Sequence, residues 1–285
     1  MTRSGTILAL GFATLCSSVG FADPVPGGAG KTVIVCYTTG SVSERDARPA
    51  VENMIRVLER IGGWTPGTFQ GRFTADSKEC ERLASTANPS FVIPSSLGFY
   101  LRHRADLVPV AQPRVHGRDA EVLRILVRRG SASTLDALKG RTLGGSLLDD
   151  PEFLKNVVFR GRIDPAAFLV LKPSRAALRA LRDLASGTLD AVLVNDQQFE
   201  ALRGLPFAKD LEVVFTADPV PLPGVFAVNA RTSEDERRRL ARALAAFCSD
   251  ADGRSFCELF GIDSFAPAGP ATYDPVIRLW EPASR

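Results

Sequence analysis

Apolar residues follow two different spacings along this chain, and segments with the two spacings alternate. Short, almost wholly apolar runs, such as Lys31 to Tyr37 (KTVIVCY) and Ala191 to Val194, predict strands that are buried on both faces of a sheet. Segments such as Pro49 to Ile61 carry apolar residues three or four positions apart and predict amphipathic helices. Strands that alternate with helices are typical of an α/β fold with a mostly parallel sheet.

The stretch from Glu121 to Asp150 shows this alternation most clearly. An alternating apolar run ends at Gly130, a short helix carries Leu135 and Leu138, and a second strand stops at Gly144-Gly145. Asp150-Pro151 then predicts a further helix, because Asp is a preferred N-cap and Pro is tolerated at the first helical position. Ligands of parallel sheets bind at the carboxyl ends of strands, so the turn that follows Gly144 is a candidate ligand loop.

Polar residues also follow the other buried strands. Hydroxyl groups at such positions can cap the next helix or, together with free N–H groups, can hold a ligand. The residue types alone leave both roles open. The candidate ligand-binding residues are Tyr37, Thr38, Ser41, Ser95, Ser96, Ser146, Asn195 and Asp196.

Two motifs resemble those of one known family. The run RGSASTLDALKGRTLGGS, which ends at Ser146, resembles the start of the second lobe of type II periplasmic solute-binding proteins. The run LASGTLDAVLVND, which ends at Asp196, resembles the strand that returns to their cleft. Within that superfamily the chain is most similar, from about Lys31 to Trp280, to the phosphate, phosphite and phosphonate-binding branch of ABC importers.

The resemblance implies a two-lobed α/β fold in which each lobe is a mostly parallel sheet flanked by helices. Two hinge crossings would join the lobes, and a small-molecule ligand would bind between them. Ala111 to Asp119 fits the first crossing, with His116 and Arg118 facing either the cleft or solvent, and Pro219 to Pro223 fits the second. We expect lobe 1 to comprise residues 31–115 and 218–285, the latter with the C-terminal helices, and lobe 2 residues 116–217.

The loop that follows Gly145 departs from the phosphonate-binding pattern. Related proteins resemble one another in a Ser/Thr-rich turn that offers hydroxyl and N–H groups to an oxyanion, whereas this chain has Ser146-Leu147-Leu148-Asp149-Asp150. Asp150 can satisfy the N–H groups at the helix start, and either carboxylate would repel a phosphate at short range. We therefore expect a neutral, zwitterionic or amine-bearing ligand in preference to a dianionic phosphonate.

The first residues predict export. Residues 1–22 have the pattern of a secretory signal peptide, and residues 23–30 (DPVPGGAG) that of a flexible leader. Leu15 is bulky before Cys16, which favours soluble periplasmic export over a lipoprotein. Export makes disulfides plausible among Cys36, Cys80, Cys248 and Cys257, with free buried thiols as the alternative.

The best-placed disulfide pair is Cys248 with Cys257. A turn between two consecutive helices can bring their Cα atoms within the roughly 4.4–6.8 Å that a disulfide needs. Such a bond would fasten the C-terminal helices to lobe 1 and leave the cleft untouched. The other pair, Cys36 with Cys80, is less secure, because Cys36 belongs to a buried strand and can be an inert core thiol.

The composition of the chain argues against several classes of function. The formal net charge is only +3, which argues against a nucleic-acid-binding protein, because such a protein needs a concentrated basic face. With two histidines, no zinc-type spacing and no nucleophile with a partnering base, we expect no metal, cofactor or catalytic residue. We therefore predict a monomeric periplasmic binding component whose partner is an ABC permease of the inner membrane. A ligand sensor for a membrane receptor and an enzyme on the same fold are the alternatives.

Overall fold

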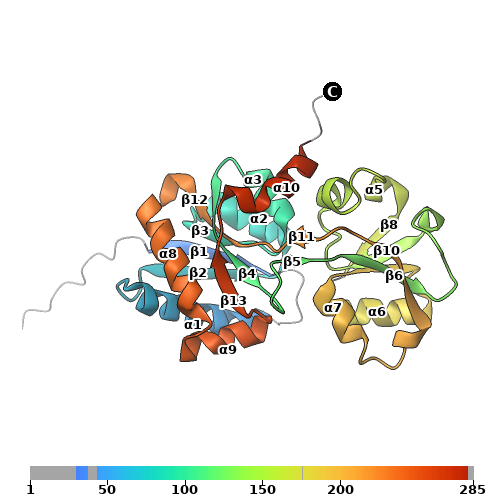
Figure 1. Ribbon diagram of the computed structural model, residues 1–285, viewed down its shortest axis with the longest axis horizontal. Helices are drawn as coiled ribbons and strands as arrows, with labels where there is room; N and C mark the ends of the chain where they lie inside the picture. The colour runs from blue at the N-terminus through green and yellow to red at the C-terminus, as the bar shows by residue number, and fades with distance from the viewer. Residues whose placement is uncertain (1–29, 38–43, 175, 282–285) are drawn as a thin grey trace, which may run out of the picture.

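The computed structural model describes residues 30–37, 44–174 and 176–281. The expected signal peptide, the leader up to residue 29, Cys16, Thr38 and Ser41 lie outside these residues. The chain forms two α/β lobes side by side (Figure 1), as predicted. Lobe 1 surrounds a six-stranded sheet and lobe 2 a five-stranded sheet, and a two-stranded ribbon lies between them.

The sheet of lobe 1 has the strand order β13-β4-β12-β3-β1-β2. Its strands are β1 Lys31–Cys36, β2 Phe69–Thr74, β3 Phe91–Ile93, β4 Leu107–Arg114, β12 Val225–Val228 and β13 Ser264–Pro267. Alternate residues of β1 face opposite sides: Val33 and Val35 enter one hydrophobic core, whereas Ile34 and Cys36 enter the other. Both faces are buried, which explains why β1 is a continuous apolar run.

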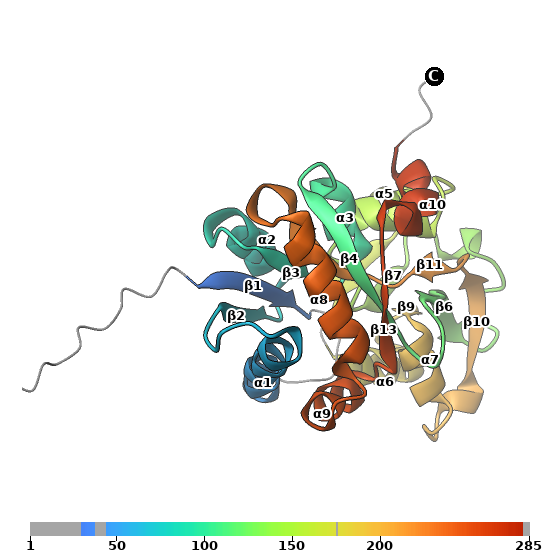
Figure 2. The ribbon, with the colours of Figure 1, turned by 60° about the vertical axis from the view of Figure 1, so that its left-hand side comes forward.

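Helices cover both faces of this sheet (Figure 2). They are α1 Glu44–Gly62, α2 Ser77–Thr86, α3 Leu97–His103, α8 Glu234–Phe247, α9 Ala251–Phe260 and α10 Pro270–Trp280. α8 and α9 pack beside α1, although they come from the opposite end of the chain. A capping box between Ser233 and Glu236 begins α8, and Gly261, in the left-handed region with φ 67°, ends α9.

Lobe 2 has the strand order β10-β6-β9-β7-β8. Its strands are β6 Arg124–Arg128, β7 Thr142–Gly145, β8 Val170–Pro173, β9 Ala191–Val194 and β10 Leu211–Thr216. Its helices are α4 Pro151–Phe153, the π-helical turn η2 Leu154–Val158, α5 Pro165–Phe168, α6 Ala177–Ser186 and α7 Asp196–Leu202. Asp150 caps α4 through the N–H group of Phe153, as the Asp-Pro pair predicts.

The sheets are more mixed in direction than the expected mostly parallel arrangement. β1 is parallel to β2 and β3, and β7 is parallel to β8 and β9. Every antiparallel pair described within the two large sheets includes β4, β6, β10, β12 or β13. Helical crossovers within a lobe produce parallel pairs, whereas β4, β6, β10 and β12 carry the chain out of one lobe or into the other.

Several element boundaries differ from those predicted. α1 begins at Glu44, ahead of Pro49, because one missing N–H near the start of a helix does not end it. The helix expected near Leu138 is a single 3₁₀ turn, η1 Asp136–Leu138. Leu178 of α6 is 43% exposed, because Ala180, Leu181 and Leu184 form the buried face of this helix.

The first crossing is shorter than expected. β4 was expected to end near Val110 but continues to Arg114, because β13, which the sequence did not predict, pairs with its second half. β5 Ala120–Glu121 then pairs antiparallel with β11 Val220–Pro221, and this ribbon joins the lobes (Figure 1). A two-stranded ribbon tolerates Pro221 because both of its strands are edges. The lobe boundaries at residues 116 and 218 remain predictions.

The C-terminal helix α10 contacts both lobes. Tyr273 is fully buried, and its ring centroid lies 5.1 Å from that of Tyr100 and 5.4 Å from that of Phe226, both in lobe 1. The same helix also packs against η2 of lobe 2 and against β11. The tail therefore stabilises the region where the lobes meet.

Two disulfide bonds are present in the structure. One joins Cys36 at the end of β1 to Cys80 of α2, and the other joins Cys248 after α8 to Cys257 of α9. The Cα atoms are 5.8 Å apart in each pair. The disulfides expected of an exported chain are thus confirmed.

Candidate ligand-binding cleft

Tyr37, directly after β1, and the loops after β3, β7 and β9 line a cleft that contains two adjoining pockets. We call the first the hinge pocket; it lies beside the β5–β11 ribbon, has a volume of about 180 Å³ and includes Tyr37, Glu121 and Asp196 in its wall. The second, the loop pocket, has a volume of about 160 Å³ and lies between Ser146, Asp149 and Asp150 of lobe 2 and α2 and α3 of lobe 1. Ser95 lines both pockets.

The candidate residues within the described part of the chain all line this cleft. Tyr37, Asn195 and Asp196 border the hinge pocket, and Ser96 and Ser146 border the loop pocket. They come together because each follows a strand of a parallel pair. Thr38 and Ser41 lie outside the described residues, so their place is still a prediction. Ligand contact by any of these residues is likewise a prediction.

Several of these side chains also organise the local backbone. The Ser96 hydroxyl accepts a hydrogen bond from the N–H of Gly98 (3.1 Å) and so caps α3. Asn195 and Gln198 form a reciprocal capping box at the start of α7. Gln198 also donates its amide to the Ser146 hydroxyl (3.1 Å). The strand ends of β7 and β9 are therefore tied to one another, which fixes the lobe 2 wall of the cleft.

Asp196 is held in a structural ion pair. Its carboxylate accepts hydrogen bonds from Arg124 (2.6 Å) and from the N–H of Val122 (3.0 Å), and Arg118 lies 3.5 Å away. Burial alone would raise the pKa of Asp196, but these hydrogen bonds and the two guanidinium groups hold it below its ordinary value. Asp196 is therefore ionised at neutral pH and fastens α7 to the start of β6.

His116 and Arg118 of the first crossing, which the sequence allowed to face either the cleft or solvent, differ in their position. Arg118 borders the hinge pocket, where it lies within ion-pair distance of Asp196 and of Glu200 (3.2 Å). His116 has a side chain that is 57% exposed, and its nearest acidic partner is Glu200 at 3.7 Å. Arg118 faces the cleft, whereas His116 faces solvent.

The acidic loop after β7 touches lobe 1 directly. Asp149 accepts a hydrogen bond from the hydroxyl of Ser77 in α2 (3.3 Å). Asp150 caps α4 with one carboxylate oxygen and accepts a hydrogen bond from Arg102 of α3 with the other. Arg102 also donates to Glu81 (2.7 Å). Asp150 therefore forms an ion pair between the lobes in addition to its predicted role as a cap.

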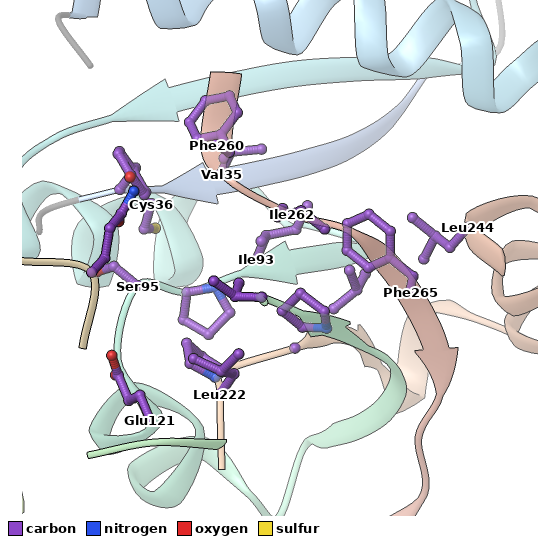
Figure 3. A pocket seen from close by; sticks show the side chains of 18 of the residues that line it. Val35, Cys36, Ile93, Ser95, Glu121, Leu222, Leu244, Phe260, Ile262 and Phe265 are labelled. Atoms are coloured by element: carbon purple, nitrogen blue, oxygen red, sulfur yellow. The ribbon is translucent and has the colours of Figure 1, made fainter. Parts of the chain in front are cut away.

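Glu121 is a cleft residue that the sequence analysis did not select. It belongs to β5 of the hinge ribbon, and its half-buried side chain points toward the pocket (Figure 3). Burial, reinforced by the negative charge of Asp196, raises the pKa of Glu121 to about 7, although a hydrogen bond from Asn195 acts in the opposite direction. The available sequence signal was a carboxylate at the first position of an apolar strand, directly after a crossing.

Aromatic residues form the lobe 1 end of the hinge pocket. Tyr37 meets Phe260 edge to face, with ring centroids 5.0 Å apart, and Phe256 lies 4.5 Å from Phe260. Tyr37 directly follows β1, and Phe256 and Phe260 belong to α9. Cys248 and Cys257 do not line the pocket themselves, but their bond connects the segments that supply Phe247, Phe256 and Phe260 to it. The expectation that this bond leaves the cleft untouched therefore stays a prediction.

The described residues contain neither a membrane-spanning helix nor a cluster of metal-binding side chains. Among them, no helix is long and apolar enough to cross a membrane. Within residues 30–37, 44–174 and 176–281, no group of three or more His, Cys, Asp or Glu side chains is arranged to hold a metal ion.

Two α/β lobes, a hinge ribbon and a solute-sized cleft define a periplasmic-binding-protein fold. The family model of the ABC transporter, phosphonate, periplasmic substrate-binding proteins matches residues 42–273. The chain therefore belongs to this family and is a solute-binding component of an ABC importer. The family is periplasmic, and its members serve a membrane permease.

Solved structures support the same fold. XAC2383 from Xanthomonas citri, bound to ATP, matches with a TM-score of 0.67 and 17% identity, covering 88% of this chain and 96% of that one. PhnD1 from Prochlorococcus marinus, in complex with methylphosphonate, matches with a TM-score of 0.63 and 14% identity, covering 87% and 97%.

A binding protein component of an ABC phosphonate transporter from Pseudomonas aeruginosa has a TM-score of 0.63 and 14% identity, covering 88% of this chain and 85% of that one. At these identities the likeness concerns the fold and not the ligand. No curated protein sequence matches the chain significantly.

Proposed function

We propose that this importer component captures a small organic solute that is neutral, zwitterionic or amine-bearing, and that it excludes phosphate and phosphonate dianions. The observation that carries the proposal is the position of Asp150. Its carboxylate already engages both the N–H of Phe153 at the start of α4 and the guanidinium of Arg102 across the cleft. These are the kinds of donor that an oxyanion would need.

The charges around the loop pocket support this proposal. Two cationic residues, Lys78 and Arg102, and three carboxylates, Glu81, Asp149 and Asp150, border it. Lys78 is exposed, where solvent screens its charge, and Arg102 is shared between Glu81 and Asp150. The loop pocket therefore has no surplus of positive charge for a dianion.

The magnitudes favour exclusion. Two like unit charges 4 Å apart repel by about 4 kcal/mol near a protein surface, and a dianion doubles that value. A hydrogen bond to a charged group contributes only about 1.5–3 kcal/mol. A phosphonate placed beside Asp149 and Asp150 would thus lose more through repulsion than one or two new hydrogen bonds provide.

The hinge pocket has a similar balance. Arg118 is its one cationic residue among the described lining residues and pairs with Asp196, while Glu121 adds a second carboxyl group to the wall. An ammonium group placed there would meet negative charge without displacing an existing ion pair. This arrangement favours an amine-bearing solute over an anion.

The test is calorimetric titration of two proteins, the unaltered protein and the double variant Asp149→Ser, Asp150→Thr. Each is titrated with phosphate and, separately, with methylphosphonate. We expect no binding of either anion by the unaltered protein at micromolar concentration, and detectable binding by the variant. Thr at position 150 remains an N-cap, so α4 is retained while Arg102 is released.

The matched control is Glu152→Gln. It also removes one negative charge from the start of α4, but Glu152 is exposed and lies outside the loop pocket. This variant should bind oxyanions no better than the unaltered protein. Tight phosphate or methylphosphonate binding by the unaltered protein would overturn the proposal.

Export and assembly complete the proposed function. We infer that the signal peptide is removed after Ala22 and that the mature protein works as a periplasmic monomer, in keeping with the family's location. Intact mass and analytical ultracentrifugation of protein from the periplasm would test both statements. A mass that includes residues 1–22, or a stable dimer, would contradict them.

A further inference from the structure

The hinge pocket continues into lobe 1 as an apolar chamber that the polar candidate residues do not explain. We define the apolar chamber by Phe256 and Phe260 of α9, Ile262 and Phe265 of β13. Met54 of α1 and Leu244 and Phe247 of α8 complete its wall from behind as core residues that are at most 1% exposed. Figure 3 shows Leu244, Phe260, Ile262 and Phe265 gathered on one side of the pocket, with Ser95 and Glu121 on the other. The pocket thus has an apolar end and a polar mouth.

The size of the pocket limits what it can receive. Its volume is about 180 Å³. An engineered cavity of about 150 Å³ in another protein, lined by Leu, Ile and Phe, stays dry and binds benzene. Water in the apolar chamber would likewise lack hydrogen-bond partners, because its walls are hydrocarbon. A phenyl ring or a short alkyl chain, together with the polar group that would occupy the mouth, is about the size that the whole hinge pocket can hold.

The polar mouth lies where the hinge ribbon meets lobe 2. Glu121 of β5 projects into it, and Asn195 and Asp196 approach from the start of α7. Asp196 is already committed to Arg124 and to the N–H of Val122. Glu121 therefore offers the carboxylate that can best accept a hydrogen bond from a solute.

We propose that the cleft binds a small aryl- or alkylamine, with its hydrocarbon group in the apolar chamber and its amine hydrogen-bonded to Glu121. This inference rests on the proposed function, because it assigns a ligand class to the same cleft. It adds a second requirement: the solute needs an apolar group of about the size of a phenyl ring as well as a suitable charge.

The first test measures how affinity depends on hydrocarbon size. The full mature chain is titrated with ethylamine, propylamine, butylamine, hexylamine and benzylamine. Each additional methylene group should tighten binding by about fourfold until the apolar chamber is full, which is the factor expected for burying one methylene. Affinity that does not change with chain length, or no binding of benzylamine at millimolar concentration, would overturn the inference.

The second test fills the apolar chamber. Ile262→Trp places a larger side chain in its wall, and we expect at least a tenfold loss of benzylamine affinity. Leu259→Trp is the matched control, because Leu259 also belongs to this region but is 44% exposed and does not line the pocket. Circular dichroism and Tm identify any variant that fails to fold. In that case Leu222→Trp replaces it, because Leu222, the residue directly after β11, also lines the pocket (Figure 3).

The third test separates charge from shape. Glu121→Gln should weaken benzylamine binding at least tenfold and leave benzyl alcohol within about twofold of the unaltered protein. Equal losses for both ligands would contradict the assignment of the amine to Glu121. If Ile262→Trp leaves the affinity for benzylamine unchanged, only the placement of the hydrocarbon group in the apolar chamber is overturned. Tight binding of methylphosphonate would overturn the proposed function itself.

Discussion

The two pockets of the cleft share their topology and differ in their chemistry. Both lie where strands of parallel pairs end, and Ser95 belongs to both. The loop pocket is closed by carboxylates that contact lobe 1, whereas the hinge pocket ends in phenyl rings from α8, α9 and β13. A shared strand-end geometry therefore does not fix the ligand, which depends on the residues that each loop and the returning C-terminal segment contribute.

The wall between the two pockets contains the Cys36–Cys80 bond, since Cys36 borders the hinge pocket and Cys80 the loop pocket. Its sequence separation is 44 residues, against 9 for Cys248–Cys257. Chain entropy then predicts a loss of about 4 kcal/mol in the free energy of unfolding for Cys36→Ser with Cys80→Ser, and about 2.7 kcal/mol for Cys248→Ser with Cys257→Ser.

Denaturant unfolding at equilibrium measures both losses. Titration of the still-folded variants with benzylamine sharpens the comparison. Loss of the Cys248–Cys257 bond should weaken binding through the apolar chamber, because its flanking residues Phe247 and Phe256 line that chamber. A larger destabilisation for the Cys248–Cys257 variant than for the Cys36–Cys80 variant would contradict the ranking.

Glu121 distinguishes the hinge pocket from the loop pocket by its titration. Its pKa rises from the ordinary 4.5 to about 7, chiefly through burial and then through the charge of Asp196. The folded state thus holds this proton more tightly than the unfolded state. The stabilisation is present below pH 4.5 and is lost as the pH rises through 7.

The matching experiment compares Glu121→Gln with the unaltered protein at several pH values. Gln does not titrate, so its stability relative to the unaltered protein should rise by about 1–3 kcal/mol between pH 4.5 and pH 8, with solvent in the cleft reducing the full effect. Asp196, Arg118 and Arg124 remain in both proteins and cancel in the comparison. A difference that does not change with pH would contradict the burial of this carboxyl group.

Gly98 tests the contact that closes the loop pocket. A Cβ atom at this position would lie 1.9 Å from Oδ2 of Asp150. Gly98→Ala should therefore hold the lobes slightly apart, weaken amine binding by roughly tenfold (about 1.4 kcal/mol) and leave each lobe folded. Small-angle scattering with saturating benzylamine should show a smaller decrease in radius than for the unaltered protein; an identical decrease would show that the lobes close without this contact.

Much of the fold was predictable because local signals agreed with one another. The apolar run of β1, the Asp150-Pro151 cap and the Ser233–Glu236 capping box each appear as a few neighbouring residues. The family resemblance supplied the two lobes, and the match over residues 42–273 confirms it. The candidates taken from strand ends all reached the cleft where the structure describes them.

The remaining features depend on contacts between distant parts of the chain. β13 is a short strand whose identity comes from its pairing with β4, and that pairing also moves the first crossing beyond Arg114. The apolar chamber joins α1, which precedes lobe 2, with α8, α9 and β13, which follow it. The raised pKa of Glu121 depends on its burial and on the nearby charge of Asp196, and both arise only in the folded chain. No spacing in the sequence shows these neighbours.

The most direct measurement is a side-by-side calorimetric titration of the unaltered mature protein with benzylamine and with methylphosphonate at neutral pH. Because carboxylates close the loop pocket and an apolar chamber ends the hinge pocket, we predict saturable heat for benzylamine and none for methylphosphonate. Saturable binding of methylphosphonate, with no binding of benzylamine, would contradict the account.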